Sequence, residues 1–288
     1  MLSLKECFQN VDMKNLLTNI PAQSLQDLKD MFRVDWPKHV VSFATIATFI
    51  RKLEKNPGYS KEVEILSLNG NWRLDGTFII HLIESHYVML GSMNDDSVYT
   101  LLSMLDFEIP FKFPCIDINY KYMISDIAAN QKMNHNLTKC FHLPKEQVLK
   151  FEFEVPEDLE LKSLKKGDAE TVNNLWPHIF PGSQEYLKNL IVNNISVGLF
   201  SLKTRQIVAW VLWIDMGAIG VLQVTQNFTG KGLASILVKA LSKLAVETYD
   251  VDVTAHIYPT NVPSINLFTK LGFKEIHEKS KIELVQNV

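Results

Sequence analysis

Residues 221–234 read VLQVTQNFTGKGLA, an apolar strand that runs through a short polar turn into the start of a helix. Gly230 and Gly232 carry no Cβ atom, so a ligand can approach the backbone of the turn closely. A helix predicted over residues 233–246 would direct unpaired N–H groups toward the turn, and Lys231 adds a positive charge. The stretch therefore predicts a cradle for a polyphosphate.

The turn alone is also compatible with a loop in which Thr229 or Gly230 only caps the helix. Two nucleotide motifs fit it poorly. A P-loop requires Ser or Thr after the Gly-Lys pair, and Gly232 stands there; a dinucleotide fingerprint requires a third glycine where the chain has Ser235. The neighbouring sequence must decide between a phosphate cradle and a simple cap.

Two motifs resemble those of the GCN5-related N-acetyltransferase (GNAT) superfamily. Residues 229–234, TGKGLA, resemble its pyrophosphate loop Q/R-x-x-G-x-G/A, with Thr229 in place of Gln or Arg. Residues 261–273, NVPSINLFTKLGF, are similar to its helix motif N-x-x-A-x-x-L-Y-x-K-x-G-F. Three further segments, at residues 176–182, 195–199 and 208–213, more particularly resemble the glycine N-acyltransferase branch of this superfamily.

The resemblance implies a coenzyme A (CoA) thioester as the donor of an acyl group to the amine of a small molecule such as glycine. It implies that the main chain of Leu222, Gln223 and Val224 holds the pantetheine and that Asn261 contacts the cofactor arm. The pyrophosphate would lie on Thr229, Gly230, Lys231, Gly232, Leu233 and Ala234. The protein must position the reactants, deprotonate the amine and assist the leaving thiolate.

The usual catalytic groups of such enzymes are missing. Ala218 stands where glycine N-acyltransferases carry a glutamate base, and Phe268 stands where many relatives carry a tyrosine acid. His256 aligns with a catalytic glutamate of ribosomal-protein alanine acetyltransferases, and an imidazole with a pKa near 6.5 suits proton abstraction. Tyr258 should share its strand face and could protonate the thiolate. For both side chains the alternative is ordinary strand packing, which is the more common role of such residues.

Three functions therefore compete. The first is an active acyl-CoA-dependent N-acyltransferase, and the second is an acyl-CoA-binding protein that has lost catalysis, which Ala218 and Phe268 favour. The third is an interaction module in which the loop holds no ligand. The sequence does not reveal the oligomeric state.

Composition excludes several classes of protein. The chain has 288 residues, 47% hydrophobic and 21% charged, which is typical of globular proteins with room for two domains. A net charge of −3 argues against nucleic acid as a partner. The apolar stretch at residues 40–50 is too short to cross a membrane, and no signal peptide is recognised. We expect an intracellular protein, cytoplasmic or mitochondrial.

Cysteine and histidine patterns predict neither a disulfide framework nor a metal site. Cys7, Cys115 and Cys140 form no C-x-x-C pair and leave an odd number, which favours free thiols in a reducing compartment. His81 and His86 lie in two adjacent predicted strands, and strand alternation predicts that they face opposite sides of the sheet.

The order of elements predicts an α/β fold in two domains. Residues 156–288 should form a GNAT domain, a mixed sheet flanked by helices, that binds acyl-CoA. Residues 1–155 should form a degenerate GNAT-like α/β domain, with residues 106–156 as a connection that carries short helices at residues 124–132 and 145–149. Further predictions are helices at residues 23–32, 40–53, 97–105 (capped by Asp95), 168–176, 183–193, 232–246 and 263–271, strands at residues 63–68, 77–83, 86–90, 159–164, 196–202, 207–215, 219–225 and 251–258, and a strand pair at residues 274–284.

Overall fold

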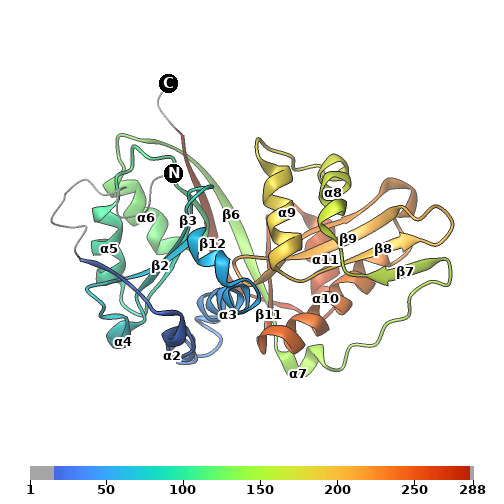
Figure 1. Ribbon diagram of the computed structural model, residues 1–288, viewed down its shortest axis with the longest axis horizontal. Helices are drawn as coiled ribbons and strands as arrows, with labels where there is room; N and C mark the ends of the chain where they lie inside the picture. The colour runs from blue at the N-terminus through green and yellow to red at the C-terminus, as the bar shows by residue number, and fades with distance from the viewer. Residues whose placement is uncertain (1–15, 286–288) are drawn as a thin grey trace.

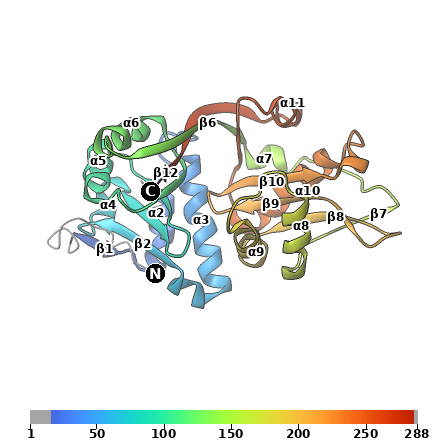
Figure 2. The ribbon, with the colours of Figure 1, turned by 90° about the horizontal axis from the view of Figure 1, so that it is seen from above.

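The structure, a computed structural model, describes residues 16–285. The strands in these residues form one mixed sheet in the order β1-β2-β3-β4-β5-β12-β6-β11-β10-β9-β8-β7. Helices lie on both faces of this sheet (Figures 1 and 2). The predicted fold class, a mixed sheet flanked by helices, is confirmed.

The first half of the sheet contains β1 (Leu17–Asn19), β2 (Val63–Leu68), β3 (Phe78–Leu82), β4 (Tyr87–Gly91), β5 (Lys112–Asp117) and β6 (Lys132–Leu143). The second half contains β7 (Leu159–Lys162), β8 (Ser196–Ser201), β9 (Ile207–Ile214), β10 (Ala218–Val224), β11 (Val253–Ile257) and β12 (Lys274–Val285). The α-helices are α2 (Leu25–Met31), α3 (Val40–Lys55), α4 (Trp72–Asp75), α5 (Asp95–Met104), α6 (Ile118–Ile127), α7 (Lys145–Val148), α8 (Ala169–Leu175), α9 (Ser183–Asn193), α10 (Leu233–Tyr249) and α11 (Val262–Lys270).

The segment predicted as a connection, residues 106–156, is the largest error. It contains β5, α6 and β6, and the helix predicted to extend to Lys132 ends at Ile127. β6 has the sequence KMNHNLTKCFHL, whose Asn, His and Lys residues favour strands weakly. It is a strand because β12 pairs with it from Lys132 to His142, which no local pattern encodes.

Two smaller predictions are also corrected. The predicted terminal strand pair is the single strand β12, which carries a register shift between Glu275 and His277. Asn94 rather than Asp95 caps α5, because its side chain accepts a hydrogen bond from the backbone N–H of Asp96.

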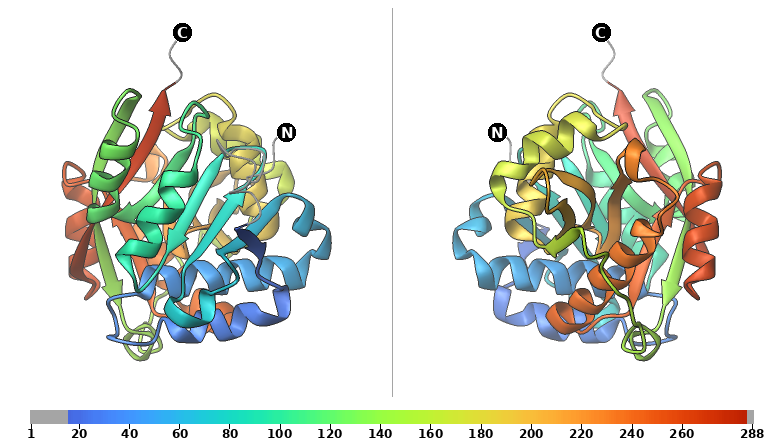
Figure 3. Two further views of the ribbon diagram at one scale, coloured as in Figure 1. Left: turned by 90° about the vertical axis from the view of Figure 1, so that its left-hand side faces the viewer. Right: turned by 90° about the vertical axis from the view of Figure 1, so that its right-hand side faces the viewer.

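The sheet runs across the predicted domain boundary between residues 155 and 156. β12, the last strand of the chain, lies between β5 and β6, and β6 pairs on its other side with β11 (Figure 3). Strands from both predicted domains are thus hydrogen-bonded side by side. The division into residues 1–155 and 156–288 stays a prediction.

In the second half, the two faces of the sheet carry different helices. Leu237 and Leu241 of α10 share a core cluster with Val211 of β9. Leu187 of α9 packs with Leu212 of β9. Because successive side chains of a strand point to opposite faces, Leu212 lies on the face opposite to that of Val211. We call these sides the α10 face and the α9 face.

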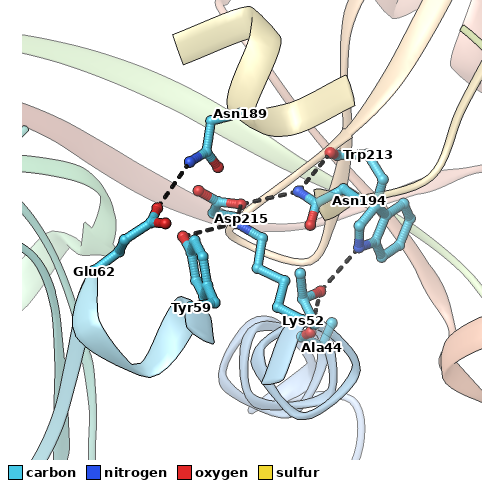
Figure 4. A network of polar contacts seen from close by, with 9 residues as sticks. Ala44, Lys52, Tyr59, Glu62, Asn189, Asn194, Trp213 and Asp215 are labelled. Carbon is cyan, nitrogen blue, oxygen red and sulfur yellow. Dashed lines mark hydrogen bonds and ion pairs between the residues drawn. The ribbon is translucent and has the colours of Figure 1, made fainter. Parts of the chain in front are cut away.

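A buried polar network connects α3 with the second half of the chain (Figure 4). Lys52 Nζ lies 2.5 Å from Asp215 Oδ1, and Asn194 donates to the same oxygen at 2.9 Å. The hydroxyl of Tyr59 accepts a hydrogen bond from Lys52 at 3.1 Å. Because a buried charge is tolerated only when it is paired, this network fixes α3 beneath the turn between β9 and β10.

Candidate functional site

The strand before the glycine turn separates from its neighbour. β10 and β11 pair at one position, where Ile219 lies opposite Ala255. The register of β10 against β9 shifts between Gly220 and Gln223, and Val221 adopts φ 53°. A positive φ is unusual for a β-branched residue, so the strand bends sharply here. Main-chain groups of residues 222–224 are thereby turned away from regular pairing with β11.

The turn itself presents open backbone. Gly230 and Gly232 have φ values of 75° and 76°, which other residues rarely adopt. A Cβ atom built on either glycine would meet no atom within 4 Å, so both face open space. Gly232 caps α10, and its carbonyl accepts from the N–H of Ser235 at 3.0 Å. The N–H groups of Leu233 and Ala234 precede this bond, so they have no intrahelical acceptor.

A cavity of about 500 Å³ adjoins this turn. Its volume lies within the usual range for sites that hold small molecules and cofactors. Six of the residues predicted to bind the cofactor line it: Val224, Thr229, Gly230, Gly232, Leu233 and Ala234. The remaining four, Leu222, Gln223, Lys231 and Asn261, are not among the lining residues. Asn261 caps α11 instead, because its side chain accepts from the N–H of Ser264 at 3.2 Å.

Two lysines that the sequence analysis did not select also line the cavity. Lys239 of α10 and Lys270 of α11 add positive charge beside the helix N-terminus. Lys239 lies four residues, or about one helical turn, after Ser235. Counting by helical turns from the glycine turn would therefore have identified Lys239 from the sequence. With Lys231, whose Nζ lies 4.8 Å from the Phe228 ring centroid, the surroundings suit a polyanion.

His256 lies on β11 and Tyr258 directly follows that strand, and neither residue is in the lining of this cavity. His256 is half-buried, and its Nδ1 lies 3.6 Å from the Sγ of Cys115. Burial, with a smaller effect of the Lys279 charge, lowers the pKa of His256 to about 3. Burial raises the pKa of the Cys115 thiol to about 12, so the pair is neutral at physiological pH. Tyr258, at the end of the strand, is 37% exposed.

The positions that lack the usual catalytic groups are buried. Ala218 is fully buried in the cluster beneath α9, so a glutamate there would place a carboxylate among apolar side chains. Phe268 is 3% exposed, and its ring packs edge-on against Phe273 at a centroid distance of 4.9 Å. Both residues act as core in this chain.

The prediction that His81 and His86 face opposite sides is wrong. Their rings are stacked with centroids 5.7 Å apart, because His86 lies in the β3–β4 turn with φ 53° and leaves the strand alternation. Within residues 16–285, no group of three or more His, Cys, Asp or Glu side chains could hold a metal ion. Cys115 and Cys140 are free, and Cys7 lies outside the described residues. No helix in the described part of the chain is long and apolar enough to cross a bilayer.

Residues 196–282, which include the glycine turn, match the family model described as FR47-like protein. No curated protein matches the chain. A Drosophila protein of known structure is 20% identical with a TM-score of 0.82, over 95% of this chain and 99% of that one.

Two further structures are similar to this chain in fold. A tandem GNAT protein from the clavulanic acid biosynthesis pathway has a TM-score of 0.54 and 9% identity, over 93% of this chain and 97% of that one. A GCN5-related N-acetyltransferase from Kribbella flavida has a TM-score of 0.52 and 10% identity, over 84% and 96%. This chain therefore has the fold of the tandem GNAT proteins, with an FR47-like segment at residues 196–282.

Proposed function

We propose that this protein transfers an acyl group from a CoA thioester to the amine of a small molecule such as glycine. One observation carries the proposal: β10 leaves β11 just before a glycine turn whose backbone is open toward a cavity at a helix N-terminus. The fold similarity to GNAT proteins is consistent with it.

The residues present fit a CoA thioester. Free N–H groups at the start of α10 suit the pyrophosphate, and Lys239 and Lys270 add charge for its phosphates. Main-chain groups of residues 222–224, on the separated part of β10, suit the amides of the pantetheine. When bound, the thioester supplies an activated acyl group.

A binding protein without catalysis is the second candidate, and burial at the catalytic positions favours it. A base works best when its pKa is near the working pH. With a pKa of about 3, His256 is neutral at pH 7 but a weak proton acceptor. The assignment of His256 as base and Tyr258 as acid stays a proposal. The burial of His256 argues against it.

We expect acetyl-CoA or a longer acyl-CoA to raise the melting temperature of the protein, whereas ATP and NAD should not. A ligand at 100 times its Kd adds about 2.7 kcal/mol to the free energy of unfolding. A thermal melt with a panel of thioesters measures this. An unchanged melting temperature with every thioester would reject both CoA-dependent functions.

The substitution His256→Gln should lower transfer to amines by less than about tenfold, because an imidazole with a pKa of about 3 adds little as a base. Since this lowered pKa keeps the ring neutral at all higher pH values, the parent's kcat/KM should show no inflection from the imidazole between about pH 5 and 9. Steady-state kinetics across this range check both points. A loss of about 10²–10⁴ at unchanged CoA affinity would instead identify His256 as the base.

A further inference from the structure

A second cavity, of about 260 Å³, lies where three helices end. Its lining residues belong to the last turns of α3, to the last two residues of α10 and to residues 193–195 at the end of α9. It shares no lining residue with the cavity at the glycine turn. Because the 17 residues of α10 each rise about 1.5 Å, the two cavities lie at opposite ends of a helix roughly 25 Å long.

The buried part of this second cavity contains an acceptor that lacks a donor. Asn194 is 5% exposed, and its Nδ2 donates to the Trp213 carbonyl at 3.0 Å and to Asp215 Oδ1 at 2.9 Å. Exchanging the two amide atoms would set an oxygen against these two acceptors, so the contacts fix the orientation of the amide. The buried Oδ1 receives no hydrogen bond from any group between residues 16 and 285. Such acceptors are rare in proteins, and a molecule in the adjoining cavity can supply the donor.

The exposed rim of the cavity has the opposite chemistry, because donors are in excess there. Arg51 Nη1 lies 2.7 Å from Glu54 Oε2, and Lys55 Nζ donates to the Val192 carbonyl at 2.7 Å. A guanidinium has five N–H donors and an ammonium three, so neither contact uses all of them. The Lys55 contact also offsets the partial negative charge at the end of α9. Two cations and one carboxylate leave the rim with one positive charge.

A ligand that fits the cavity must therefore donate in its buried part and accept at its rim. A small 2-hydroxy acid does both, since its hydroxyl can donate to Asn194 Oδ1 and its carboxylate can accept from Arg51 and Lys55. An ammonium in place of the hydroxyl would add a third cation to these two, so a hydroxyl suits the site better. Sites for drug-sized ligands begin at about 300 Å³, and the smaller volume here suits a molecule of a few heavy atoms.

We infer that the cavity at the ends of α3, α9 and α10 binds a small hydroxy acid with one negative charge. Asn194 would join this ligand to the buried network of Lys52 and Asp215, because its Nδ2 donates to Asp215. The ligand would thereby hold α3 more firmly against the second half of the chain. This site is separate from the cofactor cavity, so it stands whether or not the protein binds CoA.

Lactate, isobutyrate and lactamide test this site because they have nearly the same size and shape. Isobutyrate has a methyl group in place of the hydroxyl of lactate, and lactamide has a neutral amide in place of the carboxylate. Lactate should bind the full chain at least about tenfold more tightly than either analogue, as expected when one buried or charge-assisted hydrogen bond is lost. NMR titration measures this through the indole N–H of Trp213, whose ring stacks on Tyr249 of the cavity with centroids 5.3 Å apart.

Variants at the rim test where the carboxylate lies. Arg51→Met and Lys55→Met should each lower the affinity for lactate by about fivefold or more and change that for lactamide by less than about twofold. Lys188→Met is the matched control, because Lys188 lies on α9 outside the lining and pairs with Glu185 at 2.8 Å. All three side chains reach solvent, so the fold should persist, and thermal melts check this.

The outcomes are distinct from those of the proposed function. Absence of lactate binding, equal affinity for lactate and isobutyrate, or an unchanged lactate affinity in Arg51→Met or Lys55→Met overturns the hydroxy-acid site, even if acetyl-CoA stabilises the protein. A preference for lactate that both rim variants reduce and Lys188→Met retains supports the site, including in a protein that no CoA thioester stabilises.

Discussion

Gly232→Asp should weaken the binding of acyl-CoA by about 100-fold or more. Gly232 caps α10 at the edge of the cavity, and its missing Cβ faces open space. A carboxylate there would stand close to the pyrophosphate, and two unit charges 4 Å apart interact by about 4 kcal/mol near a protein surface. A loss of 100-fold corresponds to about 2.7 kcal/mol, so repulsion of this size is sufficient. Titration calorimetry with acetyl-CoA measures the change.

Gly232→Asn is the matched control, because the backbone strain must be separated from the charge. Gly232 has φ 76°, so any side chain at this position is strained. Asn and Asp tolerate this region better than other residues and have nearly the same shape. If the asparagine variant loses as much affinity as the aspartate variant, the loss is steric. If Gly232→Asp is folded and binds normally, the pyrophosphate lies elsewhere.

Asp215→Ala should lower the free energy of unfolding by about 3–5 kcal/mol, the cost of leaving a buried charge unpaired. The side chain of Lys52 is 1% exposed and, among residues 16–285, would keep the Tyr59 hydroxyl and nearby aromatic rings as partners. Asn194 would also lose one acceptor, although it still donates to the Trp213 carbonyl at 3.0 Å. Urea-induced unfolding, followed by circular dichroism, measures the difference.

The double variant Lys52→Met, Asp215→Ala shows whether charge or packing causes the loss. Removing both charges should restore most of the stability, because an apolar replacement of a buried ion pair is often neutral. A double variant as unstable as Asp215→Ala would show that packing beneath the turn is decisive. A loss below about 1 kcal/mol in the single variant would show that the network contributes no more than an exposed ion pair.

The second half of the chain was predictable because its signals are local. Short, mostly apolar runs predicted β8 and β9 within one residue at each end, and the amphipathic period predicted α9. Gly230 and Gly232 indicated the turn, and the structure gives both the positive φ that favours glycine. A backbone conformation that only glycine adopts easily is encoded by the residue itself.

The surroundings of the candidate catalytic residue His256 could not be predicted in the same way. The sequence suggested an imidazole with an ordinary pKa at position 256, whereas burial beside Cys115 lowers this pKa to about 3. These two residues are 141 positions apart in the sequence. The packing that sets the pKa depends on β5 and β6, both of which lie in the segment predicted as a connection.

By itself the sequence determined the elements whose residues carry their own conformational preference: the glycine turn, the amphipathic helices and the apolar strands of the second half. Only the tertiary structure decided that β12 lies between β5 and β6, that His81 and His86 stack, and that Lys52 meets Asp215 across 163 positions. Such contacts arise because a long strand and a buried charge must each find partners, and the partner is selected by how the whole sheet closes rather than by neighbours in the chain.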